Sequence, residues 1–238
     1  MSDVVLSARA VVKSYGPSPA LRGVTVGVER GEVLAITGPS GSGKSTLLLV
    51  LAGIVPPDAG EVWYAGRRLD TESEAARSKL RRTSFGVLFQ FGQLVPELTA
   101  GENVAMPLLL AGVKRRSALT AAGTWLDRFG VADLAGQRPT EMSGGQAQRV
   151  AMARALVTEP EVLFADEPTG ALDSLAGEQV LGQLARVARQ SGTTVLIVTH
   201  DAKVAAYADR EVVVRDGMLD EGAPTSALRG AHDRAFTR

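Results

Sequence analysis

The chain of 238 residues contains no cysteine. Disulfides, zinc–thiolate centres and a cysteine nucleophile are therefore excluded, and the composition is consistent with a reducing compartment. Apolar runs are short as well: the longest, Leu47–Val55 and Val104–Val113, fall below the roughly 20 residues that cross a bilayer. The first residues lack a basic segment followed by an apolar core, so we expect no secretory signal. These absences predict a cytoplasmic protein.

An excess of charge of either sign is also missing. Lys and Arg together number 26, and so do Asp and Glu, which gives a formal net charge of zero. Nucleic-acid binding usually goes with a basic excess or a basic block. The short clusters Arg81-Arg82 and Lys114–Arg116 are typical of solvated helix ends instead. We therefore expect no nucleic-acid partner.

The order of the expected elements predicts an α/β fold. Valine-rich runs predict strands, and apolar residues three and four apart predict helices. The expected strands are Val4–Val12, Val24–Glu29, Glu32–Thr37, Glu61–Tyr64, Ser84–Gln90, Val162–Ala165, Thr193–Thr199 and Val212–Arg215. The expected helices are Lys44–Gly53, Gly101–Gly112, Ser117–Phe129, Ser143–Thr158 and Ser174–Gln190. Such alternation predicts a mostly parallel sheet, into which a helical lobe, residues 91–160, is inserted.

A glycine-rich segment lies between the expected strand Glu32–Thr37 and the helix that follows it. Residues 38–45 read Gly-Pro-Ser-Gly-Ser-Gly-Lys-Ser, which fits the phosphate-binding P-loop pattern. The glycines let successive backbone N–H groups point at phosphate oxygens, and the helix adds its positive end. We expect Lys44 to reach the outer phosphates of a nucleotide and Ser45 to give an oxygen to Mg²⁺. The alternative, a Gly/Ser-rich surface turn, does not account for the strand and helix on either side.

Polar residues end two further expected strands. Asp166 and Glu167 follow Val162–Ala165; Asp166 can hold Mg²⁺, and Glu167 can polarise the water that attacks the γ-phosphate. Read alone, the pair fits an acidic turn equally well, and the P-loop favours the catalytic interpretation. His200 follows Thr193–Thr199, at the sheet edge where nucleotide sites form in open α/β sheets. A neutral imidazole there can hydrogen-bond the γ-phosphate, although a lone histidine at a strand end is more often structural.

Met142–Gln146 reads Met-Ser-Gly-Gly-Gln and precedes a long apolar helix. Ser143 is a favourable N-cap, and Gln146 stands where a capping-box partner is expected. The serine and the two glycines also make a second helix start that can bind an anion. The capping and the phosphate-binding interpretations are compatible.

These motifs together resemble the ABC-type ATPases, over nearly the whole chain. The resemblance implies a Walker A motif at Gly38–Thr46, a Walker B motif at Val162–Glu167 and the family signature at Met142–Gln146. Gln90 matches the glutamine that senses Mg²⁺ and faces the membrane subunit, with Gln93 a nearby rival that is not at the strand end. Tyr15 matches the aromatic that stacks on adenine; a packed tyrosine at the end of a strand is the alternative.

The resemblance also assigns roles to single residues. Ala171–Asp173 matches the dimer-contact loop, and His200 matches the switch histidine. The implied catalytic residues are Glu167, His200, Lys44 and Gln90, and the implied Mg²⁺ ligands are Ser45, Gln90 and Asp166. The implied ATP contacts are Tyr15, Gly38, Ser40, Gly41, Ser42, Gly43, Lys44, Ser45, Thr46, Ser143, Gly144, Gly145, Gln146 and Asp173.

By the same resemblance, residues 1–238 form one nucleotide-binding domain. Its parts are a mostly parallel RecA-like core (residues 1–90 and 161–238), an N-terminal antiparallel β subdomain and the helical subdomain of residues 91–160. ATP and Mg²⁺ are the implied cofactors. Two copies would enclose two ATP molecules head to tail and work on a transmembrane permease, which would hold the chain at the inner face of the plasma membrane.

The stretch from Phe85 to Val113 is similar to the lipoprotein-release and macrolide-export group (LolD/MacB-like) of that family. It contains Phe-Gly-Val-Leu-Phe-Gln, then Leu-Val-Pro-Glu-Leu-Thr-Ala-Gly-Glu-Asn, then Pro-Leu-Leu-Leu-Ala-Gly-Val. This similarity implies an exporter or a mechanotransmission system that acts on a lipoprotein, lipid, peptide or drug. An importer ATPase for a small polar solute and a non-transport ABC ATPase are the alternatives.

Overall fold

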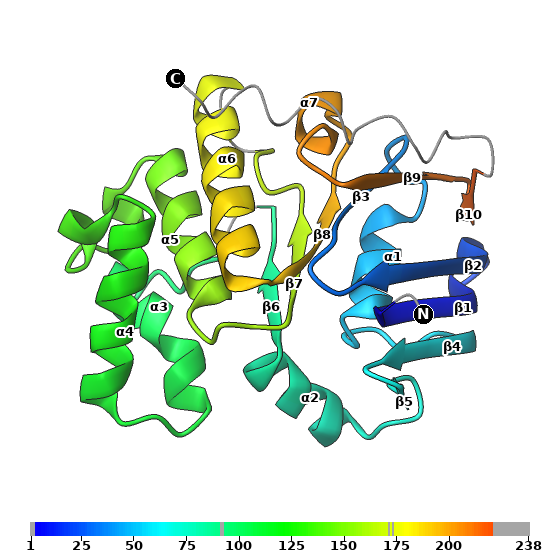
Figure 1. Ribbon diagram of the computed structural model, residues 1–238, viewed down its shortest axis with the longest axis horizontal. Coiled ribbons are helices and arrows are strands. Elements are labelled where there is room, and N and C mark those ends of the chain that lie inside the picture. The colour runs from blue at the N-terminus through cyan, green and yellow to red at the C-terminus, as the bar shows by residue number, and fades with distance from the viewer. Residues whose placement is uncertain (1–2, 91–92, 171, 173, 221–238) are drawn as a thin grey trace. The chain divides into compact units, whose positions relative to one another are not determined.

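The computed structural model describes residues 3–90, 93–170, 172 and 174–220. The chain divides into two compact units: unit one is Met1–Ser73 with Thr194–Arg238, and unit two is Glu74–Thr193. Figure 1 labels the elements of both. None of the helices in the described part of the chain has the length and apolar character needed to cross a membrane.

All expected strands and helices are present, and the structure adds short elements between them. Unit one contains β1 (Val4–Tyr15), β2 (Ser18–Glu29), β3 (Val33–Thr37), α1 (Lys44–Leu51), β4 (Ala59–Tyr64), β5 (Arg67–Arg68), β8 (Thr194–Val198), α7 (Ala202–Ala205), β9 (Arg210–Arg215) and β10 (Met218–Leu219). Unit two contains α2 (Glu74–Thr83), β6 (Phe85–Leu88), α3 (Ala100–Leu110), α4 (Arg115–Arg128), the 3-10 turns η1 (Ala132–Leu134) and η2 (Pro139–Glu141), α5 (Gly144–Leu156), β7 (Val162–Asp166) and α6 (Ser174–Ser191).

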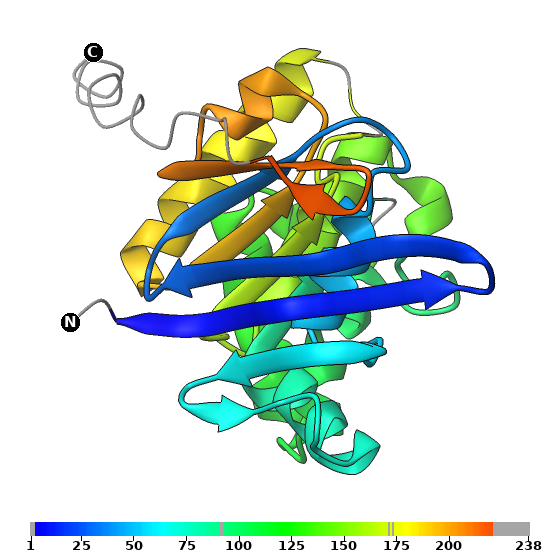
Figure 2. The ribbon, with the colours of Figure 1, turned by 90° about the vertical axis from the view of Figure 1, so that its right-hand side faces the viewer.

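An antiparallel sheet forms the N-terminal part of unit one, and its long hairpin β1–β2 is visible in Figure 2. The hairpin pairs Val4 with Glu29 at one end and Tyr15 with Ser18 at the other. β4 pairs with the opposite edge of β1, so the strand order is β2-β1-β4-β5. The sequence placed the end of β1 at Val12, which is too early, because the residues beyond it are only half-buried or exposed and carry no apolar signal.

The second sheet of unit one has the strand order β10-β9-β3-β8. β3 runs parallel to both β8 and β9, and every residue of β3 and β8 is buried. β9 and β10 form an antiparallel hairpin across Asp216 and Gly217, with φ of 48° and 77°. Two consecutive residues with positive φ are typical of a type I′ turn, which suits the twist of paired strands. The predicted parallel core is thereby confirmed.

Unit two packs helices against the parallel pair β6–β7, in which Phe85 lies opposite Val162. The Phe85 and Phe164 rings meet edge to face with centroids 5.2 Å apart. In α4, Trp125 stacks on Phe129, and both rings are buried. Figure 1 shows α3, α4 and α5 gathered in green. The expected boundaries of a separate helical lobe at residues 91–160 stay a prediction.

Helix α3 begins with a capping box. The Thr99 hydroxyl accepts from the Glu102 N–H, and the Glu102 carboxylate accepts from the Thr99 N–H. That backbone hydrogen bond, with a second from Arg115, lowers the pKa of Glu102 below its ordinary value. One residue further on, the fully buried Asn103 accepts from the Val95 N–H and donates to the carbonyls of Val95, Leu98 and Thr99. The amide of Asn103 therefore fixes the loop that leads into α3.

The sequence did not predict α2. This helix has no buried residue and hence no apolar periodicity from which to infer it. The helix carries a cluster of charged side chains instead, in which Glu74 forms ion pairs with Arg77, at 2.9 Å, and with Arg81. The hydrogen bonds from Arg81 and Arg77 lower the pKa of Glu74.

Candidate functional site

The glycine-rich segment forms a tight loop between the buried strand β3 and helix α1. At Gly38, φ is 138°, and a Cβ would lie 2.0 Å from the Val214 carbonyl oxygen of β9. At Gly43, φ is 106°, and a Cβ would lie 2.3 Å from the Ala20 carbonyl oxygen. Only glycine fits both positions, because backbone approaches from each side. The sequence pattern of the loop is thus a requirement of its packing.

Two polar side chains turn into this loop. The Lys44 ammonium donates to the carbonyls of Gly38 and Pro39 at 2.9 and 2.8 Å, and Lys44 is only 7% exposed. The Ser42 hydroxyl is buried and has no hydrogen-bond partner among the described residues. The first N–H groups of α1 have no acceptor within the helix. A loop with a buried ammonium, an unsatisfied hydroxyl and the N-terminal end of a helix fits the phosphates of a nucleotide.

The turn of the β9–β10 hairpin is hydrogen-bonded to the glycine-rich loop. The Gly217 N–H donates to the Ser42 carbonyl at 3.0 Å, and the Gly217 carbonyl accepts from the Arg22 N–H at 2.8 Å. One turn of backbone thereby connects the loop to the N-terminal hairpin. At the loop entrance, the Thr37 hydroxyl donates to the Glu211 carboxylate of β9 at 2.6 Å.

A cavity of about 430 Å³ lies beside the start of the loop, and His200 lines it together with the first loop residues. Gly38, Pro39, His200 and Glu211 are among the residues that line it. His200 is exposed and lies just beyond the end of β8, after Thr199, so it stands at the carboxyl ends of the parallel strands, where ligands bind in open α/β sheets. The structure therefore unites two of the predicted features, the loop and the histidine.

Tyr15 stands at the exposed tip of the N-terminal hairpin. The residue is 50% exposed, and the Lys13 ammonium lies 5.9 Å from its ring centroid. The alternative of a packed tyrosine at the end of a strand does not hold, because half of its surface is open. Its assignment to adenine stays a prediction.

In unit two, the acidic pair directly follows the buried part of β7. Val162–Ala165 are fully buried, and Asp166 and Glu167 are half-buried. Glu167 has a φ of 45°, a left-handed backbone conformation that residues other than glycine seldom adopt. The turn closes with the Gly170 N–H donating to the Glu167 carbonyl at 3.0 Å.

Gln90 reaches this turn from β6. Its Nε2 lies 3.0 Å from the place where a Cβ would stand on Gly170. β6 ends at Leu88, so the predicted strand Ser84–Gln90 was too long at its end. The backbone carbonyl of the rival Gln93 accepts from Arg154 at 2.9 Å, and burial lowers the pKa of that arginine. The preference for Gln90 over Gln93 stays a prediction.

The signature segment opens α5 with a complete capping box. The Ser143 hydroxyl accepts from the Gln146 N–H at 3.3 Å, and Gln146 Oε1 accepts from the Ser143 N–H at 2.8 Å. Ser143 and Gly144 are exposed, while Gly145 lies near Leu172. The capping interpretation is thus confirmed, and the exposed helix start leaves the phosphate-binding one open. Ala171 and Asp173 of the predicted dimer-contact loop lie outside the described residues.

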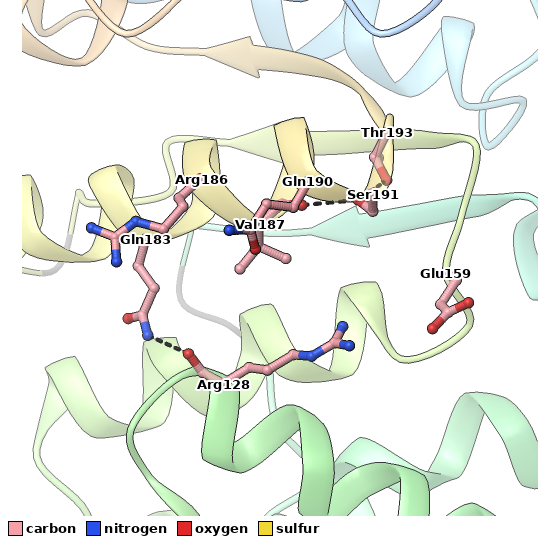
Figure 3. A pocket seen from close by; sticks show the side chains of 8 residues that line it. All are labelled: Arg128, Glu159, Gln183, Arg186, Val187, Gln190, Ser191 and Thr193. Atoms are coloured by element: carbon pink, nitrogen blue, oxygen red, sulfur yellow. Dashed lines mark hydrogen bonds between the residues drawn. The ribbon is translucent and has the colours of Figure 1, made fainter. Parts of the chain in front are cut away.

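A second cavity, of about 520 Å³, lies in unit two between the C-terminal end of α4 and the last turns of α6 (Figure 3). Arg128, Gln183 and Arg186 line it, with Glu159 on the segment before β7. None of the predicted site residues is among its lining. It stands where strands begin, on the edge opposite to that used for nucleotides, so we exclude it as the nucleotide site.

A buried parallel strand that leads through a glycine-rich loop into a helix, with a lysine inside the loop, defines a P-loop ATPase. The model of the ABC transporter family matches residues 21–170. The chain is 42% identical to the lipoprotein-releasing system ATP-binding protein LolD 2 of Rhodopirellula baltica, over 98% of this chain and 95% of that one. It is 49% identical to the LolD of Koribacter versatilis, over 84% of this chain and 89% of that one. The chain belongs to the ABC transporter family. It is the ATP-binding and ATP-hydrolysing subunit of such a transporter.

Solved structures agree with this membership. The dimeric ATP-binding cassette MJ0796 with ADP and Pi superposes with a TM-score of 0.87 at 36% identity, covering 94% of this chain and 99% of that one. The cbiO1 protein of Clostridium perfringens, part of the cbiONQ complex, superposes with a TM-score of 0.83 at 31% identity, covering 92% of this chain and 87% of that one. The predicted ABC-type α/β fold is confirmed.

Proposed function

We propose that this chain powers the export or release of lipoproteins by a separate membrane permease. The observation that carries the proposal is the similarity to lipoprotein-releasing ATP-binding proteins, at 42–49% identity over most of the chain. The described helices include none that could cross a membrane, so the substrate path would belong to a partner. Contact with that permease would place the chain on the inner face of the plasma membrane.

The loop residues would hold the ATP phosphates. The Lys44 ammonium donates to two loop carbonyls and would donate to the outer phosphates of bound ATP. Backbone N–H groups between Ser40 and Thr46 and the buried Ser42 hydroxyl would donate to the remaining phosphate oxygens, and Tyr15 would stack on the adenine. His200, which shares a cavity with the loop entrance, would hydrogen-bond the γ-phosphate.

Mg²⁺ would accompany the nucleotide. The described residues include no group of three acidic or histidine side chains able to hold a metal alone, which fits an ion bound mainly by phosphates and a few protein oxygens. The resemblance to the ABC-type ATPases implies Ser45, Gln90 and Asp166 as those protein ligands. The ion would supply neutralisation of the phosphate charge.

Glu167 would act on the attacking water. Its carboxylate follows the strand β7, and its backbone turn is closed by hydrogen bonds, so its direction is set before the substrate arrives. Hydrolysis also requires a second copy. Ser143–Gln146 would donate to the ATP of the partner, in the manner of a cassette that, like MJ0796, is dimeric, and Asp173 would lie at the same contact.

The Glu167→Gln variant tests this assignment. The amide keeps the shape of the side chain but is a poor proton acceptor, so ATP should bind normally while hydrolysis slows by about 100-fold or more. Steady-state ATPase rates, with sedimentation in ATP, would show a slow enzyme that accumulates as a dimer. Near-normal turnover would contradict the role of Glu167, and a slow enzyme that stays monomeric in ATP would contradict the sandwich dimer.

A further inference from the structure

Glu167 adopts a backbone conformation that has to be maintained by its surroundings. Its φ of 45° costs about 1–2 kcal/mol for a residue with a Cβ. Such strain persists only where neighbouring groups fix the backbone. Pro168, the next residue, restricts the backbone of Glu167 further because its ring clashes with the N–H and Cβ of the residue before it. The groups that hold this turn therefore decide where the Glu167 carboxylate points.

One of those groups comes from α5, the helix that begins in the signature segment and is called the signature helix below. Gln148 lies on the first turns of α5, and its Nε2 donates to the Pro168 carbonyl at 2.6 Å. The side chain is only 3% exposed. The two residues are 20 positions apart in the chain, so the bond is a tertiary link between α5 and the turn after β7.

Because the Gln148 side chain is buried, water cannot take the place of its hydrogen-bond partner. Burying an amide without a hydrogen bond is costly, and the buried Gln148 amide meets this requirement by donating to the Pro168 carbonyl. Two backbone hydrogen bonds lie within the turn itself: the Gly170 N–H donates to the Glu167 carbonyl, and the Leu172 N–H donates to the Thr169 carbonyl. The link through Gln148 therefore couples the turn to an element outside it.

We infer that Gln148 is a positioning residue, which holds the strained Glu167–Pro168 turn and makes the direction of the hydrolytic carboxylate depend on the place of the signature helix. The inference rests on the proposed role of Glu167. Ser143, at the start of the same helix, would touch the ATP held by the partner copy. One amide would then connect the nucleotide contact of one site to the carboxylate of the other.

Gln148→Met tests the link, because methionine fills a similar volume and has no N–H to donate. We expect kcat for ATP hydrolysis to fall by about tenfold, since misplacing a catalytic group by a fraction of an ångström is enough for such a loss. KM for ATP should stay within about twofold, because the phosphate loop is untouched. Gln148→Asn, which keeps a buried amide but is one methylene too short, should give a smaller loss in kcat.

Gln183→Met is the matched control. Its Nε2 also donates to a backbone carbonyl, that of Arg128, at 2.5 Å, and Figure 3 shows this bond beside the second cavity. Thermal melting of all variants measures the stability that each loses with its hydrogen bond, which is buried at Gln148 and exposed at Gln183. A role in stability alone would lower the melting temperatures of Gln148→Met and Gln183→Met and leave kcat of both unchanged.

The double variant Gln148→Met/Glu167→Gln separates the two proposals. If Gln148 acts through Glu167, the double variant should hydrolyse ATP no more slowly than Glu167→Gln alone, since groups that act as a unit are not additive. An additive tenfold loss, or full kcat in both Gln148 variants, would overturn the inference while Glu167→Gln remains slow. Fast hydrolysis by Glu167→Gln itself would instead overturn the proposed function, and the inference with it.

Discussion

The strongest structural requirement on the phosphate loop is the contact between Gly38 and strand β9, and Gly38→Ala would break it. The alanine Cβ would stand 2.0 Å from the Val214 carbonyl oxygen, in a backbone with a φ of 138°. That conformation costs about 1–3 kcal/mol for alanine, and relieving the clash by shifting packed backbone costs typically about 1–3 kcal/mol more. We therefore expect a loss of about 2–6 kcal/mol from a total that is commonly about 5–15 kcal/mol.

Gly41→Ala is the control within the same loop. Gly41 also has a positive φ, 76°, but a Cβ there meets nothing within 4 Å. Its cost should be limited to the left-handed backbone, about 1–2 kcal/mol. Urea unfolding of the nucleotide-free chain measures both variants without relying on ATP. If Gly38→Ala were no less stable than Gly41→Ala, the packing of the loop against β9 would be wrong.

Three further predictions concern other parts of the chain. Asn103→Ala should lower the free energy of unfolding by about 2–4 kcal/mol, because several backbone groups lose their partner; a loss below about 1 kcal/mol in urea unfolding would contradict this. The pKa of Glu102 is lowered in the fold, so its contribution to stability is present above the ordinary value of 4.5 and is lost as the pH falls through the folded pKa. The stability difference between wild type and Glu102→Gln, measured by urea unfolding, should hence shrink at acidic pH, and a difference that grows there would refute the shift. Finally, Ser143→Arg and Lys44→Ala chains, each inactive alone, should regain ATPase activity on mixing, since one dimer site then has both an intact loop and an intact signature; no recovery would count against contact in trans.

The arrangement of strands was predictable because buried β3, β7 and β8 carry an apolar signal that leaves few alternatives. The phosphate loop was predictable for a different reason: its glycines are required by close backbone contacts at Gly38 and Gly43, so the pattern in the sequence records the packing. The role of Lys44 followed from the P-loop pattern, and that of His200 followed from its place after an expected strand and from the family resemblance. Their assignment to phosphates stays a prediction that the variants above test.

Other features left no trace in the sequence. Helix α2 has no buried face, so its charged residues read as a solvated segment. The link from Gln148 to Pro168 could not be predicted, because a glutamine on a helix carries no sign of the carbonyl that it meets 20 residues later. The left-handed conformation of Glu167 was equally hidden, since glutamate has no preference for it. Tertiary contacts decide these details, and local patterns do not encode them.

The central claim, that this ATPase powers a membrane permease, is tested most directly by capture of its partner. A tagged Glu167→Gln chain, held in its ATP-bound state, would be used to pull proteins from detergent-treated membranes of the source organism. The account predicts a permease with few membrane spans and a large extracytoplasmic domain. A permease with many spans and a solute-binding protein would contradict the lipoprotein-release assignment, and ribosomal or chromosomal proteins without any permease would contradict the transport function itself.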